Sequence, residues 1–249
     1  MEKLYHLGFA DACGAKYVIL PGDPGRVESI AKHLDNPRFL NQNREYTTWI
    51  GEIEKEPVLV MSTGMGGPST AIAVEELSKL GVKTYIRIGT CGGMAEQVEA
   101  GDVVIATGAI RQEGTSREYV PIEFPAIADL DVTNALVQAV KNTKEKWHTG
   151  VVQCKDSFYG QHSPDRMPIG YELKDKWQAW IKAGCLASEM ESASLYIVAQ
   201  VLGLKAGCVL SVVWNQEREA KGLSNKEVHD TTPAIKTAVE AIRLMITGG

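Results

Sequence analysis

Arg87 lies inside an apolar stretch, residues 84–88, that runs into a glycine-rich segment containing Gly89, Gly92 and Gly93. A guanidinium is rarely buried without an anionic or hydrogen-bonding partner, and its planar fork matches the oxygens of phosphate or carboxylate. Glycines let the backbone approach an anion closely and point N–H groups toward it. Two interpretations follow from this stretch alone: an anion site, or an internal pair of Arg87 with a carboxylate beside an ordinary turn.

A second arginine, Arg26, follows a similar step from strand to turn. Residues 17–20 are an apolar run of strand length, and the segment Pro21-Gly22-Asp23-Pro24-Gly25-Arg26 leads into a helix expected over residues 27–33. Such helix N-termini bind anions, because free N–H groups and the helix dipole both favour negative charge. The alternative is a plain turn with a solvent-facing Arg26. No glycine-rich turn has the spacing of a dinucleotide site or a P-loop.

Two further segments carry groups that could hold an aromatic ring and a sugar. Phe158, with Gln161 and Arg166 close behind, would give a stacking face with planar hydrogen-bonding edges, which suits a nucleobase; a lone Phe is more often core. Ser188 and Glu191 have the spacing of a helix capping box, which by itself accounts for the glutamate. The alternative is that Glu191 accepts hydrogen bonds from paired hydroxyls, with Met190 against an apolar sugar face.

The elements that must position these groups alternate between strands and helices. Strands are expected over 17–20, 44–50, 57–61, 84–88, 101–107, 149–154 and 209–214. Helices are expected over 27–33, from the turn at 62–70 to about residue 80, over 129–142, from residues 188–191 to about 202, and over 227–245. Helices between buried strands usually indicate right-handed parallel crossovers. We therefore expect an α/β fold. Without a repeat, low-complexity tract or linker, residues 1–249 are expected to form one domain.

Composition narrows the classes of partner and compartment. A net charge of −5 argues against nucleic acid as a partner, because binding its backbone needs a basic face. No apolar run approaches membrane-spanning length, and the first residues lack a hydrophobic signal region, so a cytoplasmic protein is expected. The five cysteines are scattered and lack metal-site spacing, which predicts reduced thiols.

Taken together, the motifs resemble the nucleoside phosphorylases of the uridine phosphorylase and hexameric purine nucleoside phosphorylase type. The segments that carry the resemblance, over nearly the whole chain, are His6-Leu7-Gly8, Pro21-Gly22-Asp23-Pro24, Arg44-Glu45-Tyr46-Thr47-Thr48-Trp49, Ser62-Thr63-Gly64-Met65-Gly66-Gly67-Pro68-Ser69-Thr70, Arg87-Ile88-Gly89-Thr90 and Glu189-Met190-Glu191-Ser192-Ala193. The resemblance implies a central mixed twisted sheet, curved into a partial barrel and flanked by helices. It also implies a homohexamer built of dimers that share active sites.

The resemblance also implies roles for individual residues. It assigns phosphate contacts to Gly22, Arg26, Arg87 and Thr90, with Arg44 from the neighbouring subunit. It assigns ribose contacts to Met190 and Glu191, with His6 offered across the dimer, and base contacts to Phe158, Gln161 and Arg166. Arg87, Gln161 and Arg166 would be the catalytic groups. Phosphate would be a co-substrate, with no organic cofactor, and a potassium ion would lie at the dimer interface near Glu45, Met65 and Ser69.

Three departures from the family pattern bear on the base site and the phosphate turn. The proline expected before Gly160 is absent, and Ser163 stands at the offset where the pattern has an arginine, so the role of Arg166 is inferred. Cys91 replaces a usual threonine. Gln216 stands where an arginine is common, which leaves Gln216 or Arg218 to approach the far edge of the base.

The reaction implied is the reversible phosphorolysis of a pyrimidine nucleoside, uridine, in pyrimidine salvage by a pentosyltransferase. Purine relatives protonate the leaving base with an acidic residue near the end of the last core strand, where this chain has Asn215, an amide without acidic function. The alternatives are a purine nucleoside phosphorylase, a hydrolytic nucleosidase and a non-catalytic nucleoside-binding protein. Three arginines suited to phosphate count against hydrolysis. Acceptance of thymidine or deoxyuridine stays open.

Overall fold

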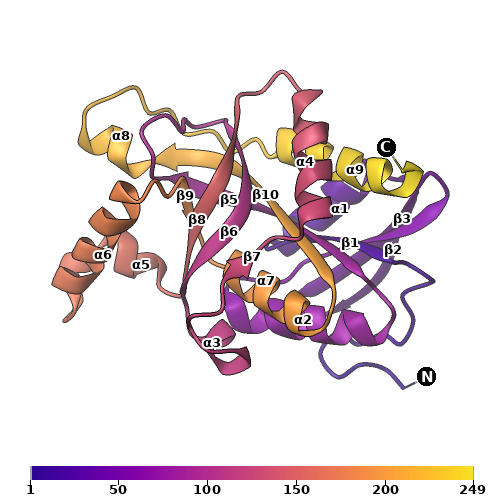
Figure 1. The fold of residues 1–249 in the computed structure, drawn as a ribbon. Coiled ribbons are helices and arrows are strands. Elements are labelled where there is room, and N and C mark those ends of the chain that lie inside the picture. The colour runs from indigo at the N-terminus through magenta and orange to yellow at the C-terminus, as the bar shows by residue number, and fades with distance from the viewer. Residues whose placement is uncertain (1, 249) are drawn as a thin grey trace.

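The computed structural model describes residues 2–248 as a mixed sheet with helices on both faces (Figure 1). The strands are β1 (Tyr17–Pro21), β2 (Asp35–Asn43), β3 (Tyr46–Ile53), β4 (Glu56–Met61), β5 (Thr84–Gly93), β6 (Val103–Gln112), β7 (Ala126–Ile127), β8 (Trp147–Lys155), β9 (Ala187–Glu189) and β10 (Lys205–Asn215). Most are rich in buried apolar and β-branched residues, as strands covered on both faces are. The α/β class with a mixed sheet is confirmed.

The sheet curves into a partial barrel because its path of paired strands returns on itself. The order is β10-β6-β8-β9-β5-β1-β4-β3-β2, and β10 also pairs with β5, so five strands form a ring. Strand β1 runs parallel to both β4 and β5, and β5 is parallel to β10. Strands β2, β3 and β4 continue the sheet as antiparallel neighbours. The parallel arrangement brings the carboxyl ends of β1 and β5 to one edge.

The helices fall into groups by the face or end of the sheet that they cover. They are α1 (Val27–Ala31), α2 (Gly67–Lys79), α3 (Thr115–Tyr119), α4 (Leu130–Lys141), α5 (Phe158–His162), α6 (Gly170–Lys182), α7 (Ser192–Val201), α8 (Gln216–Ala220) and α9 (Thr232–Thr247), with short 3₁₀ turns at Pro24–Arg26 and Pro164–Arg166. Figure 1 shows α4 and α9 above the sheet, α2, α3 and α7 below it, and α5, α6 and α8 gathered at one end. Within residues 2–248, no helix has the length and apolar character needed to cross a bilayer.

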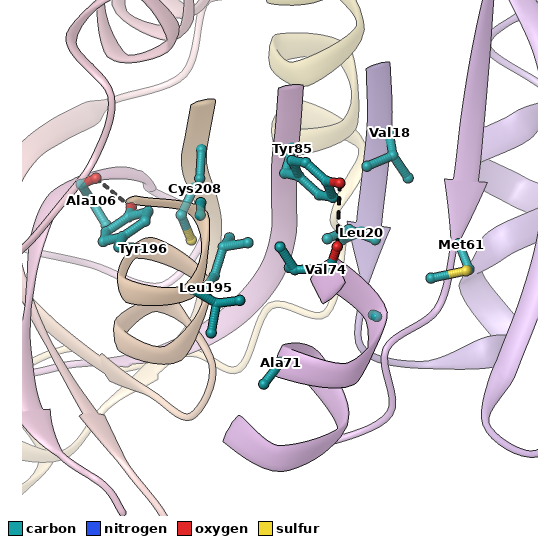
Figure 2. Close-up of a cluster of buried hydrophobic side chains, with 14 of the residues drawn as sticks. Val18, Leu20, Met61, Ala71, Val74, Tyr85, Ala106, Leu195, Tyr196 and Cys208 are labelled. Atoms are coloured by element: carbon teal, nitrogen blue, oxygen red, sulfur yellow. Dashed lines mark hydrogen bonds between the residues drawn. The ribbon is translucent and has the colours of Figure 1, made fainter. Parts of the chain in front are cut away.

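Each face of the sheet has its own apolar core. Helices α2 and α7 pack on one face, where Figure 2 shows Val74 and Tyr196 among side chains of β1, β4, β5 and β10. The buried Tyr196 hydroxyl donates a 2.7 Å hydrogen bond to the carbonyl of Ala106, so its one polar atom is satisfied. Val27, Val132 and Ile242, from α1, α4 and α9, pack on the other face. The two cores hold the strand ends that carry the site.

The predicted elements occur, with corrections at their bounds. The glycine-rich segment after Arg87 is not a turn: β5 continues through Gly93, because β10 pairs with it along its whole length. The last helix begins at Thr232, where Pro233 occupies its first turn, and not at residue 227. Strand β2 and helix α6 were not predicted. β2 is mostly exposed, and only two α6 residues, Gly170 and Trp177, are buried, so their apolar patterns are weak.

Candidate active site

A cavity of about 1170 Å³ opens beside the carboxyl ends of β1 and β5. Pockets for single small molecules usually measure about 300–1,000 Å³, so this one lies just above that range. Among the residues that line it are these sequence-predicted ones: Gly22, Arg26, Glu45, Met65, Ser69, Arg87, Thr90, Phe158, Gln161, Met190 and Glu191. Segments spread over most of the chain thus meet at one cavity. Arg44, His6 and Arg166 are not part of its lining.

Arg87 combines the two interpretations that its sequence left open. Its Nε lies 3.0 Å from Oε2 of Glu189, and its Nη2 lies 2.5 Å from Oε2 of Glu191, all three side chains being buried. Burial works against the guanidinium charge, but Glu191 and Glu189 outweigh it and raise the pKa of Arg87 above its ordinary value. The arginine is therefore an internal ion-pair partner. It is also an open donor, because one nitrogen is left over.

The third guanidinium nitrogen of Arg87 faces the turn after β1. Nη1 is buried and, within residues 2–248, has no hydrogen-bond partner. A Cβ built on Gly22 would lie 3.9 Å from Nη1 and 3.1 Å from the carbonyl oxygen of Gly64, so this nitrogen points to the Gly22 turn. A buried unpaired donor costs about 1–3 kcal/mol. Such a group at a cavity wall indicates a site built for an acceptor that binds there.

Gly89 is required by the same arginine. A Cβ at this position would lie 2.6 Å from Nη2 of Arg87 and 2.9 Å from Cδ2 of Leu210, both far inside contact distance. The glycine thus makes room for the guanidinium within the strand, which is a packing role and not the turn role expected from the sequence.

Arg26 lies in the same cavity wall and is only loosely held. It ends the 3₁₀ turn Pro24–Arg26, whose N-cap, Asp23, accepts a hydrogen bond from Gly25 N–H at 2.8 Å. Its nearest carboxylate is Asp23, at 3.8 Å from Nε, and the side chain is half-buried. A second cation is therefore free to turn toward an anion at the Gly22 turn.

The capping-box interpretation of Ser188 and Glu191 is wrong. Helix α7 begins at Ser192, and the carboxylate that accepts its first N–H groups belongs to Glu189, at 2.9 Å from Glu191 N and 3.0 Å from Ser192 N. Glu191 instead turns into the cavity, where its Oε1 accepts a 2.6 Å hydrogen bond from Gly66 N–H. The Glu191 carboxylate is thereby held by Gly66 at the start of α2 and by Arg87 on β5, in an orientation suited to a ligand in the cavity.

The two carboxylates around Arg87 have pKa values that are shifted in opposite directions. Burial opposes the charge of Glu189, but Arg87 and the hydrogen bonds from Ser192 and Glu191 hold its pKa below the ordinary value. Burial raises the pKa of Glu191, helped by the nearby charge of Glu189 and opposed by Arg87. One arginine cannot fully compensate two carboxylates in a dry site. Glu191 is the group whose charge is least compensated.

The far end of the cavity is aromatic. Phe158, the first residue of α5, is 51% exposed and so presents its ring to the cavity rather than to the core. Its ring centroid lies 4.3 Å from that of His162, and His162 lies 6.0 Å from Trp214 on β10. Planar rings on two elements make a surface on which a flat ligand can stack. Neither His162 nor Trp214 was predicted.

A chain of polar side chains stands beside these rings. The Lys155 ammonium, at the end of β8, donates a 2.5 Å hydrogen bond to the Ser188 hydroxyl. That hydroxyl lies 2.8 Å from Oε1 of Gln161 and 2.7 Å from Oε1 of Gln153 and, having one proton, donates to one of them at a time. Gln161 in turn donates to Gln216 at 3.2 Å. The predicted Gln161 is thus held at both ends of its amide.

Sequence reasoning missed Lys155, although a signal was present. Lys155 ends a strand whose preceding residues, Val152–Cys154, are buried, just as Arg87 interrupts a buried run. A cation at such a place needs a reason, and the same reasoning applied to residue 155 would have found it.

Three residues considered for the base site lie elsewhere. Arg166 is exposed, with its guanidinium 5.8 Å from the ring centre of Tyr159. Arg218 donates to the carbonyls of Ser224 and Glu96, away from the cavity. Asn215 is buried as the N-cap of α8: its carbonyl accepts from Glu217 and Arg218, and its amide donates to Ala95 and Val98. The end of β10 therefore offers neither an acid nor a free amide.

Arg44 and His6, predicted to act across a subunit interface, lie together outside the cavity of their own chain. Arg44 adopts a φ of 53° and its guanidinium lies 5.8 Å from the ring centre of Tyr5. His6 Nδ1 lies 2.7 Å from Glu76 Oε1. Neither side chain therefore contributes to the cavity of its own chain. Within residues 2–248, no three His, Cys, Asp or Glu side chains gather as a metal site would.

Comparison with known proteins identifies the family. Residues 16–246 match the Phosphorylase superfamily. The chain is 56% identical to a uridine phosphorylase of Treponema pallidum (strain Nichols), over 98% of this chain and 94% of the relative, and 41% identical to a uridine phosphorylase of Escherichia coli (strain K12), over 98% and 99%. It is 40% identical to a guanosine phosphorylase of Halorubrum lacusprofundi (strain ATCC 49239 / DSM 5036 / JCM 8891 / ACAM 34), over 86% and 85%. Because the family match covers residues 16–246 and these uridine phosphorylases align with 98% of the chain, the chain belongs to the Phosphorylase superfamily.

Proposed function

We propose that this chain is a uridine phosphorylase, a pentosyltransferase that reversibly converts uridine and phosphate to uracil and ribose 1-phosphate. The observation that carries the proposal is the unpaired Nη1 of Arg87, which faces the Gly22 turn in a cavity shared with Phe158 and Gln161. Relatives named uridine phosphorylase that are 39–56% identical over nearly the whole chain support the same reaction.

In this proposal the phosphate lies at the Gly22 turn, held by Arg26, Arg87 and Thr90. One of its oxygens attacks the anomeric carbon while the glycosidic bond breaks and its electron pair leaves with the base. Positive charge develops on the sugar and is stabilised by the phosphate and by Glu191; negative charge develops on the base and is stabilised by donors at the aromatic end of the cavity. Holding both substrates in one cavity contributes roughly 7–11 kcal/mol in well-oriented reactions. No covalent protein intermediate is required.

The sugar would lie between the two ends, against Met190 and Glu191. Glu191 is well placed to accept hydrogen bonds from paired hydroxyls, because the Gly66 N–H and Arg87 fix its carboxylate. The base would stack on Phe158 and receive hydrogen bonds from Gln161. A base contact of Arg166 stays a prediction from the resemblance. Its side chain is not part of the cavity lining in this chain.

We further propose that the site is completed by a second copy of the chain, within a cytoplasmic homohexamer. Arg44 would approach the phosphate and His6 the 5′-hydroxyl of the partner's substrate. A complementation experiment tests this sharing: chains carrying Arg44→Met are mixed with chains carrying Glu191→Gln under conditions that exchange subunits. A shared site restores activity on mixing, because one of the two sites in each mixed dimer then contains neither change. Mixtures that stay as inactive as the separate variants would contradict it.

A potassium ion at the dimer interface is part of the same proposal. Monovalent and other hard cations prefer oxygen ligands. Glu45 and Ser69 both flank Gly64, whose Cβ would lie 2.9 Å from Glu45 Cγ and 3.5 Å from Ser69 Oγ, and Ser69 Oγ lies 3.3 Å from the carbonyl of Met65. A carboxylate, a hydroxyl and a carbonyl are thus close together. Activity and melting temperature in potassium compared with a large organic cation test this site.

The deciding experiment follows uracil release from uridine with and without phosphate. We expect release only with phosphate, together with ribose 1-phosphate. Equal cleavage in phosphate-free buffer would identify a hydrolase, and no cleavage of any nucleoside in the series under either condition would identify a binding protein. Guanosine and inosine are included because one relative is a guanosine phosphorylase. We expect no cleavage of these purine nucleosides, because Asn215 caps helix α8 and offers no proton to a leaving purine. Thymidine and deoxyuridine complete the series.

A further inference from the structure

Lys155 is a buried cation without a counterion. Its residue is 6% exposed, and within residues 2–248 no carboxylate oxygen lies within 4.0 Å of Nζ. Among these described residues, the one hydrogen-bond partner of Nζ is the neutral Ser188 hydroxyl. Buried charges are ordinarily paired, since desolvation is costly. A lysine kept in this state at the wall of a cavity is suited to an anion that appears there.

The position of Lys155 within the cavity indicates which anion that is. Among the described residues, Arg26, Arg87 and Lys155 are the lysines and arginines of the cavity lining. Arg26 and the free Nη1 of Arg87 lie beside the Gly22 turn. Lys155 is connected instead, through Ser188, to Gln161, which lies beside Phe158 on α5. The cation is therefore placed at the end where the proposed reaction generates a negatively charged base.

We propose that Lys155 is the catalytic cation of the base site: positioned by the Ser188 hydroxyl, it acts with the Gln161 amide to bind a carbonyl oxygen of the pyrimidine and stabilises the negative charge of the leaving base. This inference rests on the proposed function. As the glycosidic bond breaks, its electron pair moves onto the ring and the carbonyl oxygens. Lys155 keeps its proton and supplies electrostatic stabilisation and a hydrogen bond, and a proton from solvent later neutralises the released base.

The polar chain also gives the site a preference among bases. An ammonium has three donors and no acceptor, so it matches a ring edge that carries carbonyl oxygens and mismatches one that carries an amino group. Lys155 is thus expected to favour uracil-type bases and to disfavour cytosine at the same place. A site built around a buried donor rejects a base that leaves the donor unpaired.

The test compares Lys155→Met, which keeps the length of the side chain and removes its charge, with Lys155→Arg, which keeps the charge. The control is Lys182→Met, an exposed lysine at the end of α6, outside the cavity lining. By analogy with loss of one oxyanion donor, Lys155→Met is expected to lower kcat for uridine about 100-fold, with the KM for phosphate unchanged. Lys155→Arg is expected to retain more activity, and the control to match the parent chain.

A leaving-group series separates stabilisation of the base from a merely structural role. 5-Fluorouracil is more acidic than uracil and needs less help to leave, so the loss caused by Lys155→Met is expected to be several-fold smaller with 5-fluorouridine than with uridine. Ser188→Ala, a smaller change in the same polar chain, provides the same comparison if Lys155→Met folds poorly. Equal losses with both nucleosides, or a loss confined to the KM for phosphate, overturn the inference. Failure of the parent chain to require phosphate would instead overturn the proposed function.

Discussion

The two ends of the cavity hold their cations in opposite ways. At the Gly22 turn, Arg87 is compensated by two buried carboxylates and still has a free nitrogen. At the aromatic end, Lys155 is held by a neutral hydroxyl, and burial lowers the pKa of its ammonium below the ordinary value against the opposing charges of Glu189 and Glu191. The first arrangement fixes a charge permanently, whereas the second leaves a charge to be compensated by the ligand.

The difference follows from what each end must do. In the proposed reaction, phosphate is anionic before and after the bond breaks, so its site needs a rigid cation that is stable without a substrate. A base becomes anionic only as the bond breaks, and an interaction that is stronger in that state than with the neutral substrate is the kind that accelerates a reaction. An uncompensated lysine supplies such an interaction. An arginine already paired with two carboxylates would supply less.

Removing the compensated cation should have the largest effect. Arg87→Met leaves the buried carboxylates of Glu189 and Glu191 without their partner, and breaking such a pair costs about 3–5 kcal/mol. We therefore expect a loss of that size in the free energy of unfolding, measured by urea denaturation, in addition to loss of phosphorolysis. Unfolding at the urea concentration of the parent chain would show that the compensation is not structural.

The room made for Arg87 gives the next effect. Gly89→Ala places a Cβ 2.6 Å from Nη2 of Arg87 and should destabilise the protein by about 1–3 kcal/mol, as overpacking does. Gly92→Ala is the matched control on the same strand. Its added Cβ would lie 3.9 Å from the carbonyl oxygen of Trp214, an ordinary contact distance. Thermal unfolding of the two variants measures the comparison. Similar melting temperatures would argue against a steric role for Gly89.

Arg26 tests the anion site without the structural cost. Its loose 3.8 Å approach to Asp23 and half-buried side chain predict little change in stability for Arg26→Met. Loss of one charge-assisted hydrogen bond, worth about 1.5–3 kcal/mol, predicts a KM for phosphate at least about ten-fold higher. Initial rates over a range of phosphate concentrations, with the KM for uridine as internal control, give the result. An unchanged KM for phosphate would place the anion elsewhere.

The smallest expected effect is a shift in pH dependence. Because burial lowers the pKa of Lys155, the charged form is lost at a lower pH than for an ordinary lysine, and activity should fall as the pH rises through that value. The charged or titratable groups around it are Glu189, Glu191, Cys91, Cys154 and His162. Lys155→Arg keeps its charge throughout, so its alkaline fall in kcat/KM for uridine should move to higher pH. Ionisation of uridine itself affects both chains equally. Superimposable profiles would therefore show that the alkaline fall in kcat/KM does not come from Lys155.

Much of the cavity lining at the Gly22 turn could be predicted from the sequence because its signals are local. Glycine-rich segments directly after apolar runs marked the ends of β1 and β4, and a charged residue inside an apolar run marked Arg87. The aromatic end of the cavity was predicted less well. Gln161 was found, but its partners Lys155, Ser188 and Gln216 come from β8, β9 and α8, and no spacing along the chain connects them.

The sequence by itself determined the α/β class, the family and the residue types that meet at the site, because apolar periodicity and glycine-bounded strand ends are written in neighbouring positions. The tertiary structure decided what those residues do. It made Glu191, a candidate capping-box residue, an ion-pair partner of Arg87. It also made Asn215 a helix cap and left Lys155 without a counterion among the described residues. Hydrogen bonds and ion pairs between distant segments depend on strand order and register, and these are set by packing of the whole chain rather than by any one stretch.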